Sequence, residues 1–478
     1  MDAYRPEDIA ACVGGELLNG SQGPVTGVSI DSRRTQPGDL FVAITTQTND
    51  GHQYLPAAFA CGAKAALVSR RQAQIHLRDW DIFTLIAVDD PVAALQCWAQ
   101  AHRRRFSVPV IAITGSNGKT TTKEFVAAAL SHLGPILRTE GTLNNHLGVP
   151  VTLLGLTAEH RAAVVEMGMN HAGEIRVLGQ MAEPTMGIIM NTGQAHLEFF
   201  PSLDALVNAK WELAATMVGE RLLVLNCDDA GLRARGAHYD GPIRWFGLET
   251  SCEWHPTEIE QSGDGRWRFR VRDAVVDLQV PGRHMVGNAL AALAAADALR
   301  VPLAEAARRI SATSSSERRM RSLWLGGILV LDDAYNANPS SMEAALHTLM
   351  TLQPEDGGRR IAVLGGMREL GGMSVALHRH VGRIAAQLVV VAVGELAADI
   401  AAGARDVEGA TVIEFETHEE ASAWLAEHLR PGDVVLVKGS RSERMERVID
   451  ALRERLEQPA AGQGRPENEG ERARVEMA

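Results

Sequence analysis

The run Gly115–Thr121, with the sequence GSNGKTT, contains the residue types that bind a nucleotide phosphate. An apolar β-branched segment, Val110–Ile113, precedes it as a predicted strand, and an alanine-rich segment, Lys123–His132, follows it as a predicted helix. In such a unit, glycines let backbone N–H groups surround phosphate oxygens, Lys119 adds a positive charge, and the hydroxyl of Thr120 reaches Mg²⁺. The longer phosphate-binding pattern has one more glycine, at the end of this strand, so a chance turn before a helix is the alternative.

Two further candidates stand where predicted strands end. Glu166 closes the strand Ala162–Glu166, and His196 follows the strand Met186–Asn191. Because ligands of parallel α/β sheets gather at the carboxyl ends of the strands, both side chains are expected near the phosphate loop. Glu166 is predicted to ligate Mg²⁺ directly or through water, with helix capping or ion pairing as the alternative. His196 is a candidate second ligand, although a lone histidine is more often only a polar side chain.

A lysine and an asparagine on predicted helices are the next candidates. Lys210 lies within the helix Leu203–Met217 beside a tryptophan, so it is not on a plain surface face. A partly buried lysine reacts as an amine, even with CO₂ to form a carbamate, whereas a solvated lysine is the default. Asn288 opens the predicted helix 287–298, where it acts either as an N-cap or as an adenine contact.

Near the C-terminal end, two predicted strands are followed by polar, turn-forming residues. The first run, Asp332–Ser341, has the sequence DDAYNANPSS, and the second, Lys438–Arg441, has the sequence KGSR. Two polar strand ends in one α/β domain indicate that its sheet faces the nucleotide site. Ser340 is also a candidate N-cap for the helix that follows, and the two interpretations are compatible.

The predicted elements form three α/β regions and a tail. Residues 1–105 are a small α/β domain with strands at Val25–Ile30, Leu40–Ile44, Ala65–Val68 and Leu85–Val88. It ends in a basic run, 102–105, that is expected to be a solvated surface where one domain passes into the next. Residues 106–312 have the alternation of a parallel sheet, with strands at Val110–Thr114, Ala162–Glu166, Met186–Asn191, Leu222–Asn226 and Ile243–Phe246.

An antiparallel segment and a third domain complete this prediction. Residues 253–280 alternate apolar and polar side chains and contain Asp264-Gly265, which predicts a hairpin added to the parallel sheet. Residues 313–458 are predicted to be a second doubly wound, Rossmann-like domain. Its strands are expected at Ile328–Asp332, Arg360–Leu364, Leu388–Val393, Val412–Phe415 and Val434–Val437. Residues 459–478 are polar and charged, and we expect them to be disordered.

The composition restricts the function classes. A net charge of −12 argues against a general binder of nucleic acids or anionic membranes. The five cysteines are scattered without a C-x-x-C pair, which indicates reduced thiols and no zinc site. The acidic N-terminus does not resemble a signal peptide, and no run has the ~20 apolar residues of a membrane span. A cytoplasmic enzyme is expected.

Taken together, the motifs resemble those of the Mur ligase family, ATP-dependent amide-forming enzymes of peptidoglycan synthesis. The resemblance spans nearly the whole chain and rests on TGSNGKTT at 114–121, TLNNHLGVP at 142–150, EMGMNHAGEI at 166–175, AHLE at 195–198 and DDAYNANPSSM at 332–342. The family usually has glycine at the positions of Phe199 and Trp211 and an acid at the position of Gly366. The second, third and fifth runs point to the family member that joins D-alanyl-D-alanine to UDP-N-acetylmuramoyl-tripeptide.

The resemblance implies roles for individual residues. The ATP phosphates would be held by Gly115, Ser116, Asn117, Gly118, Lys119, Thr120 and Thr121. Thr120 and Glu166 would ligate one Mg²⁺, and His196 and Lys210, as its carbamate, a second. The nucleotide would also contact Asn288, Arg319, Asp333 and Asn336. The uridine side would be bound by Ser32, Arg33, Asp50, Gly51 and His52, and the muramoyl side by Thr142, Asn144 and Asn145. Lys438, Ser440 and Arg441 would approach the dipeptide or the phosphates.

The implied reaction is formation of an acyl phosphate on the tripeptide from ATP, followed by attack of the dipeptide amine. Lys119, Glu166, His196 and Lys210 would be its catalytic residues, and the third domain is expected to close over the second to exclude water. A monomer is expected. Two alternatives remain open: another amide ligase of the same architecture that adds a single amino acid, and a P-loop ATPase switch.

Overall fold

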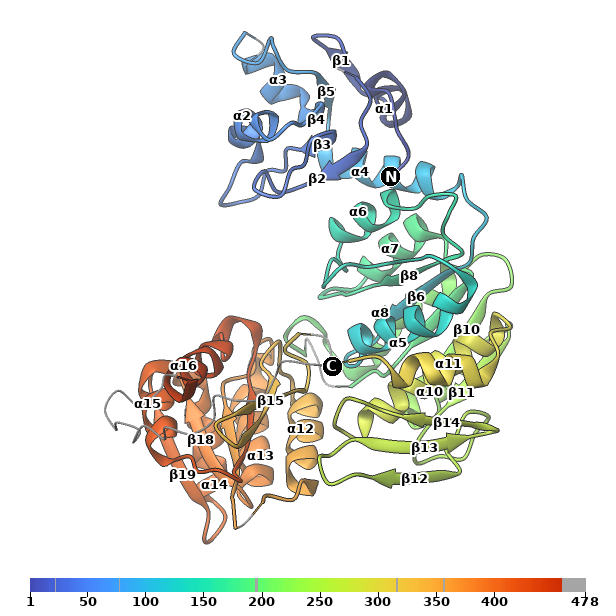
Figure 1. Cartoon of the computed structure of the whole chain (residues 1–478). Coiled ribbons are helices and arrows are strands. Elements are labelled where there is room, and N and C mark those ends of the chain that lie inside the picture. Colours follow the sequence, from blue (N-terminus) through green and yellow to red (C-terminus); the bar gives the residue numbers. More distant parts are fainter. Residues whose placement is uncertain (22, 77, 194–196, 315–316, 356, 458–478) are drawn as a thin grey trace, which may run out of the picture.

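The computed structural model describes residues 1–457 except 22, 77, 194–196, 315–316 and 356 (Figure 1). The described chain forms three α/β domains and a small antiparallel sheet, which confirms the predicted fold class. The predicted tail, 459–478, lies outside the described residues. No helix in the described part of the chain has the length and apolar character needed to span a bilayer.

The N-terminal domain contains a five-stranded sheet in the order β1-β5-β4-β3-β2, with only β1 antiparallel to its neighbour. Its strands are β1 (Glu16–Leu18), β2 (Gly27–Ser29), β3 (Asp39–Val42), β4 (Ala65–Ser69) and β5 (Leu85–Val88). Its helices are α1 (Pro6–Val13), α2 (Leu55–Ala60), α3 (Arg70–His76) and α4 (Pro91–Arg103). All four strands predicted here are confirmed with bounds within two residues, the largest differences being the start of β2 at Gly27 and the end of β3 at Val42.

The helix α4 joins this domain to the next, and it corrects one prediction. The basic run 102–105 is expected to be solvated, which is confirmed for Arg104 and Arg105, whereas His102 and Arg103 are buried. The guanidinium of Arg103 donates to the carbonyl oxygens of Ala182 (2.9 Å) and Phe106 (2.6 Å), and His102 Nε2 lies 2.8 Å from the carbonyl oxygen of Leu156. These carbonyls lie at helix ends or in loops, where a buried acceptor needs a donor. The run therefore fixes the joint between the domains.

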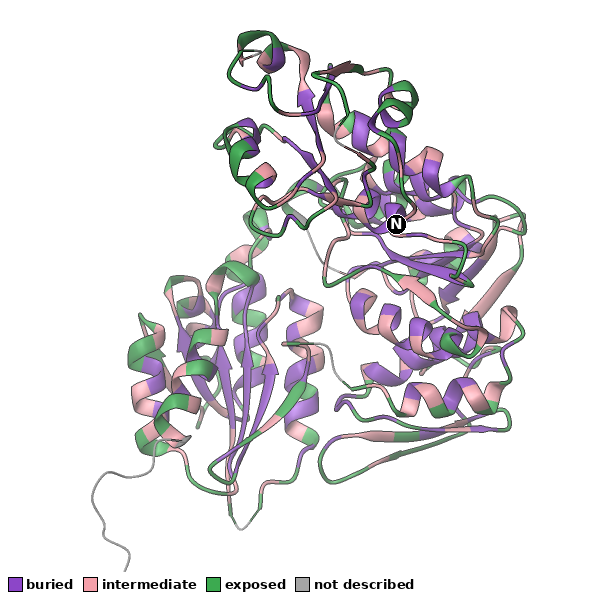
Figure 2. Cartoon of the chain, turned by 45° about the horizontal axis from the view of Figure 1, so that its top comes forward, coloured by how far each residue is buried: buried purple, intermediate pink, exposed green. Residues whose placement is uncertain are grey.

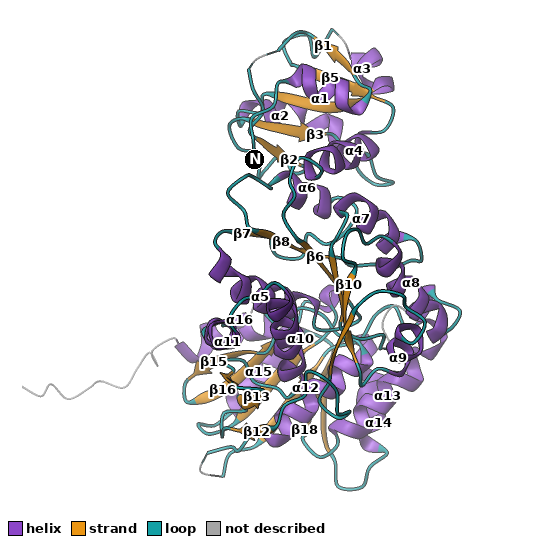
Figure 3. Cartoon of the chain, turned by 90° about the vertical axis from the view of Figure 1, so that its right-hand side faces the viewer, coloured by secondary structure: helices purple, strands orange, loops and turns teal. Residues whose placement is uncertain are grey.

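The central domain contains a six-stranded, wholly parallel sheet in the order β11-β10-β9-β6-β8-β7. Its strands are β6 (Val110–Thr114), β7 (Ile136–Arg138), β8 (Ala162–Glu166), β9 (Met186–Ile189), β10 (Leu222–Asn226) and β11 (Ile243–Phe246). Its helices are α5 (Lys119–Leu130), α6 (Gly148–Leu154), α7 (Glu174–Ala182), α8 (Leu203–Ala215), α9 (Ala230–Gly236), α10 (His284–Ala298) and α11 (Leu303–Ser311). Figure 3 shows α4 and α6 between the N-terminal sheet and the strands of this sheet.

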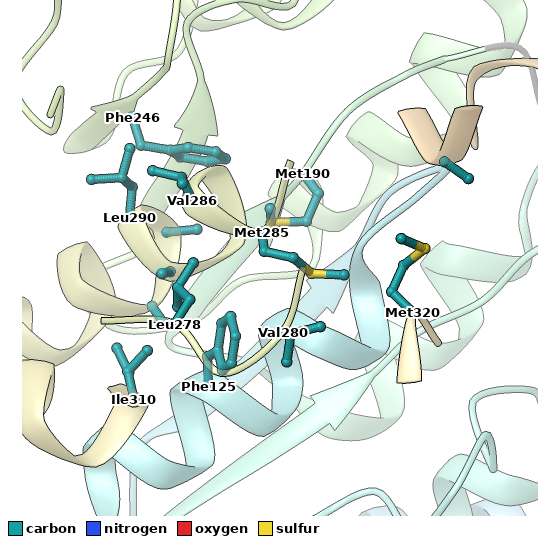
Figure 4. Close-up of a cluster of buried hydrophobic side chains, with 14 of the residues drawn as sticks. Phe125, Met190, Phe246, Leu278, Val280, Met285, Val286, Leu290, Ile310 and Met320 are labelled. Atoms are coloured by element: carbon teal, nitrogen blue, oxygen red, sulfur yellow. The ribbon is translucent and has the colours of Figure 1, made fainter. Parts of the chain in front are cut away.

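The predicted antiparallel segment is confirmed as a three-stranded sheet, β12-β13-β14. Its strands are β12 (Glu258–Gln261), β13 (Trp267–Val271) and β14 (Ala274–Asp277), and Asp264-Gly265 lies in the turn between the first two. This sheet packs below α10 and α11 in Figure 1. One apolar cluster joins it to the parallel sheet through Phe125, Leu278, Val280, Leu290 and Ile310 (Figure 4).

The C-terminal domain contains a six-stranded sheet in the order β15-β16-β20-β17-β18-β19, parallel except for the edge strand β15. Its strands are β15 (Arg321–Leu325), β16 (Ile328–Asp333), β17 (Arg360–Leu364), β18 (Val389–Val393), β19 (Thr411–Phe415) and β20 (Val434–Lys438). Its helices are α12 (Pro339–Thr351), α13 (Ser374–Ala385), α14 (Ala398–Arg405), α15 (His418–His428) and α16 (Glu446–Glu457). Figure 2 shows the buried strands between helices whose outer faces are exposed, as expected for a sheet covered on both sides.

Candidate active site

The phosphate loop connects β6 to α5 as predicted. β6 ends at Thr114, and α5 begins at Lys119, directly after the loop, rather than at Lys123. Gly115 and Gly118 have positive φ angles of 149° and 81°. The φ of Gly118 is one that glycine adopts without strain, and a Cβ atom there would also lie 2.5 Å from Oδ1 of Asn288 on α10, which would have to move. The loop backbone and the N-terminus of α5 form the anion-binding end of a helix.

An asparagine that the sequence did not single out anchors this loop. Asn191, just beyond β9, accepts the N–H of Asn117 with Oδ1 at 2.9 Å and donates from Nδ2 to the carbonyl oxygen of Asn117 at 3.1 Å. Its own carbonyl oxygen accepts the N–H of Ser116 at 3.0 Å. These three bonds fix the loop in one conformation from the neighbouring strand.

Lys119 is the cation of the phosphate loop. Its Nζ donates to the carbonyl oxygens of Gly115 (2.8 Å) and Ser116 (3.3 Å). Burial lowers the pKa of Lys119, and the negative charge of Glu166 acts in the opposite direction. An anionic ligand beside this ammonium would favour its charged form, as phosphate binding requires.

Two oxygen atoms in the site fit a magnesium ion. Oγ1 of Thr120 and Oε2 of Glu166 are buried and have no hydrogen-bond partner among the described residues. The other carboxylate oxygen of Glu166, Oε1, accepts a bond of 2.8 Å from Nδ2 of Asn144. Hydroxyl and carboxylate oxygens are preferred Mg²⁺ ligands, and Mg²⁺ is commonly held by one or two side chains together with phosphates and water. Within the described ranges no three His, Cys, Asp or Glu side chains gather as a cage for a metal.

The second predicted metal position is described only in part. His196 lies outside the described residues. Lys210 on α8 is buried, with 1% of its surface exposed, and burial together with the charge of Lys119 lowers its pKa well below the ordinary value. Its amine is therefore held toward the neutral form that reacts with CO₂. The neighbouring Trp211 packs its ring edge-on against the ring of Tyr239, with 5.9 Å between the ring centres, so it has a packing partner of its own beside Lys210.

The C-terminal domain contributes an ion pair. Nζ of Lys438, at the end of β20, lies 2.5 Å from Oδ2 of Asp333 and donates to the carbonyl oxygen of Asn336 at 3.0 Å. Oδ1 of Asp333 accepts the N–H of Met320 at 3.1 Å. Both polar strand ends predicted from the sequence are thus brought together at one edge of the sheet.

Direct hydrogen bonds connect this domain to the central domain. Nδ2 of Asn338 donates to Oδ1 of Asn117, and Nδ2 of Asn117 donates to Oγ of Ser340, both at 2.8 Å. The hydroxyl of Tyr335 donates to Oγ1 of Thr142, also at 2.8 Å. The guanidinium carbon of Arg319 lies 4.2 Å from the centre of the Tyr335 ring, within the range of a cation–π contact.

A cavity of about 1210 Å³ lies between the two domains. Of the predicted residues, it is lined by Ser116, Asn117, Gly118, Lys119, Thr121, Thr142, Asn144, Asn145, Glu166, Asn288, Arg319, Asp333, Asn336 and Lys438. Residues that sequence reasoning did not name also line it, among them Asn191, Asp228, Asp229, His284, Tyr335 and Asn338. Gly115, in the phosphate loop, and Thr120, on the first turn of α5, do not line it.

Several predicted binding residues do not line this cavity. Ser440 is buried, and its Oγ accepts the N–H of Arg368 at 2.9 Å; Arg441 is exposed, 5.6 Å from the ring of Tyr335. The five candidates of the N-terminal domain, Ser32, Arg33, Asp50, Gly51 and His52, lie apart from it.

Within the N-terminal domain three of these candidates, Arg33, Asp50 and His52, have side-chain partners. Arg33 is exposed and forms an ion pair of 2.7 Å with Asp31, which lowers the pKa of that carboxyl to about 2. His52 is buried, with Nδ1 2.6 Å from Asp50, and its Nε2 accepts the N–H of Ser69 at 3.0 Å. His52 therefore holds its own loop against β4.

Two predicted helix caps are wrong, and one unexpected glycine is explained. Asn288 lies inside α10, which begins four residues earlier at His284, so it does not cap that helix. Asn338, and not Ser340, caps α12 in a capping box with Ser341. A Cβ atom at Gly366, where the family usually has an acid, would lie 2.3 Å from Cβ of Leu396, so this fold leaves no room for a side chain there.

The fold and the site define an α/β enzyme of the P-loop type, with a nucleotide-sized cavity between its central and C-terminal domains. Three family models match the chain: "Mur ligase family, catalytic domain" at 24–103, "Mur ligase middle domain" at 113–296 and "Mur ligase, glutamate ligase domain" at 318–441. The chain belongs to the Mur ligase family.

The relatives that match have a common name. Proteins called UDP-N-acetylmuramoyl-tripeptide–D-alanyl-D-alanine ligase from Synechocystis sp. and Escherichia coli are each 34% identical, over 90% and 91% of this chain and 92% and 96% of theirs. Crystal structures of MurF from Acinetobacter baumannii (TM-score 0.85, 31% identity, 95% of this chain and 99% of that one) and of MurF from Thermotoga maritima with ADP (0.79, 26%, 91% and 98%) have the same fold.

Proposed function

We propose that the chain is an ATP-dependent amide ligase that adds D-alanyl-D-alanine to UDP-N-acetylmuramoyl-tripeptide and so makes the pentapeptide precursor of peptidoglycan. One observation supports this most strongly. A single cavity is lined by the phosphate loop, by the segment 142–146 and by the polar strand ends of the C-terminal domain. ATP and the carboxylate substrate that it phosphorylates can therefore meet in one site, and the relatives described above carry the name of this activity.

The reaction has two steps. The terminal carboxylate of the tripeptide attacks the γ-phosphorus of ATP, giving an acyl phosphate and ADP, and the free amine of the dipeptide then displaces phosphate to form the amide. Lys119, at the start of α5, offsets charge on the transferring phosphoryl group. Asn338 bonds to Asn117 in the phosphate loop and Tyr335 bonds to Thr142, and both bonds hold the C-terminal domain against the central domain. A closed arrangement of these two domains would protect the acyl phosphate from water.

Thr120 and Glu166 would hold the Mg²⁺ ion that accompanies ATP, which supplies positive charge to the phosphates. Lys210, as a carbamate, and His196 are proposed for a second ion. The low pKa of Lys210 supports carbamate formation, because only a neutral amine adds to CO₂.

The substrates are assigned to the domains by the family resemblance. The uridine side would contact Ser32, Arg33, Asp50, Gly51 and His52 in residues 1–105. The muramoyl side would contact Thr142, Asn144 and Asn145 in residues 106–312, and the dipeptide or the phosphates would contact Lys438, Ser440 and Arg441 in residues 313–458. We further propose that the protein is a cytoplasmic monomer.

Product mass tests this function. The protein is incubated with ATP, Mg²⁺, UDP-N-acetylmuramoyl-tripeptide and either D-alanyl-D-alanine or single amino acids. The proposal predicts the pentapeptide mass only with the dipeptide, whereas product with a single amino acid would indicate another ligase of this architecture. Release of phosphate from ATP that is as fast without the tripeptide substrate and the dipeptide as with both would indicate an ATPase switch.

A further inference from the structure

Lys123 carries a buried positive charge that the reaction described above does not use. Its side chain is 1% exposed, on the second turn of α5. Its Nζ donates to the carbonyl oxygens of Thr139 at 2.8 Å and Gly141 at 3.0 Å, and it lies 3.0 Å from a carboxylate oxygen of Glu124. A buried ammonium is costly unless it is paired and hydrogen-bonded, so these three contacts account for its presence.

Lys123 follows Lys119 by four residues. Residues i and i+4 lie on the same side of a helix. The first turn of α5 thus supplies the lysine of the phosphate loop, and the next turn supplies the lysine that holds the segment Thr139–Asn145, here called the 139–145 loop. One rigid helix connects the two loops.

The 139–145 loop makes further contacts with the site. Oγ1 of Thr139 accepts the N–H of Glu166 at 3.0 Å, and Nδ2 of Asn144 donates to Oε1 of Glu166 at 2.8 Å. Thr142 accepts the hydroxyl of Tyr335 from the C-terminal domain. The loop therefore touches the carboxylate proposed for Mg²⁺ and the domain that covers the cavity.

We propose that Lys123 is a positioning residue for the tripeptide substrate, the acyl donor: its ammonium fixes the 139–145 loop to α5, and so sets Asn144 on Glu166 and Thr142 under Tyr335. This proposal rests on the proposed function for the identity of that substrate. The N–H groups of Lys123 hold the loop, because they donate to two of its carbonyl oxygens. Glu124 only balances the positive charge of the lysine.

Hydrogen exchange of the free protein tests this without any substrate. In Lys123→Met, which keeps the length but removes the donors, amides of residues 139–147 should exchange about tenfold faster, since a charge-assisted bond to each carbonyl is lost. Amides of the phosphate loop should stay within about twofold of the wild type. Glu124→Gln is the matched control: it removes the partly exposed ion pairs with Lys123 and with Arg138, keeps both bonds from Lys123 to the loop carbonyls, and should change neither region.

Steady-state kinetics and ADP binding complete the test. Lys123→Met should raise the KM for UDP-N-acetylmuramoyl-tripeptide and lower kcat, each about tenfold, with the Kd of ADP within about twofold. Three results for Lys123→Met would overturn the assignment. These are an unchanged exchange rate in residues 139–147, an exchange rate there equal to that of Glu124→Gln, and faster exchange throughout the protein. If Lys123→Met does not fold, Lys123→Gln replaces it; failure of both to fold would make the role purely structural. A wild type without pentapeptide product would refute the proposed function but leave the exchange result valid.

Discussion

Removal of the Tyr335 hydroxyl tests the contact between the two domains. This hydroxyl donates to Oγ1 of Thr142 at 2.8 Å, and both residues line the cavity that the phosphate loop also lines. Tyr335→Phe keeps the ring beside Arg319 and deletes one neutral hydrogen bond, which contributes about 0.5–1.5 kcal/mol. If the closed arrangement is the active one, its population should fall by the corresponding factor, about 2- to 12-fold.

A double-mutant cycle isolates this bond from other effects of the two side chains. Thr142→Val removes the acceptor, and the double variant removes both partners. We expect the kcat/KM of the double variant for the tripeptide substrate to be at most about twofold lower than that of the less active single variant. Tyr239→Phe is the control, because its hydroxyl binds the carbonyl oxygen of Arg221 within the central domain and should leave kcat/KM unchanged. Fully additive losses in the cycle would refute the role of this bond in closure.

Three further predictions concern charged groups. Lys119→Ala should lower turnover at least about 100-fold, because the phosphoryl group loses its nearest cation; a near-normal rate would show that the phosphate loop is misassigned. Lys210→Ala should be inactive and partly restored by small carboxylates that replace the carbamate; an unaffected rate would remove that role. Burial raises the pKa of Asp332 to about 6. The folded protein therefore binds this proton more tightly than the unfolded chain does, and its free energy of unfolding falls by about 3 kcal/mol as the pH rises through 6. Asp332→Asn should therefore raise the melting temperature at pH 8, and this gain should shrink toward pH 5; an equal gain at both pH values would contradict the assignment.

The sequence was sufficient for those strands whose signal is local. β6, β8 and β10 have the predicted bounds, because buried parallel strands are continuous apolar runs that end in polar residues. The edge strand β11 also has the predicted bounds. The edge strand β15 was not predicted: its residue Trp324 is 60% exposed, and only pairing with β16 makes this segment a strand. The helix α4 was not predicted either, because its charged end is buried by carbonyl groups about 80 residues away in the sequence.

The same limit applies to the site. Glu166 and Asp333 are the last residues of β8 and β16, and Lys119 follows the loop after β6, so strand ends located these motif residues. Asn191 and Lys123 have no motif of their own: their roles come from backbone atoms of loops that the fold brings beside them. A lysine four residues after the loop lysine on a helix is the one local signal that indicates Lys123.

The transfer of an oxygen atom from the carboxylate of the tripeptide substrate to inorganic phosphate tests the proposed reaction most directly. UDP-N-acetylmuramoyl-tripeptide is labelled with ¹⁸O in its terminal carboxylate and incubated with ATP, Mg²⁺ and D-alanyl-D-alanine. If the carboxylate attacks the γ-phosphorus and the amine then displaces phosphate, one ¹⁸O per product must appear in the inorganic phosphate. Amide product with unlabelled phosphate would contradict the acyl-phosphate route through this site.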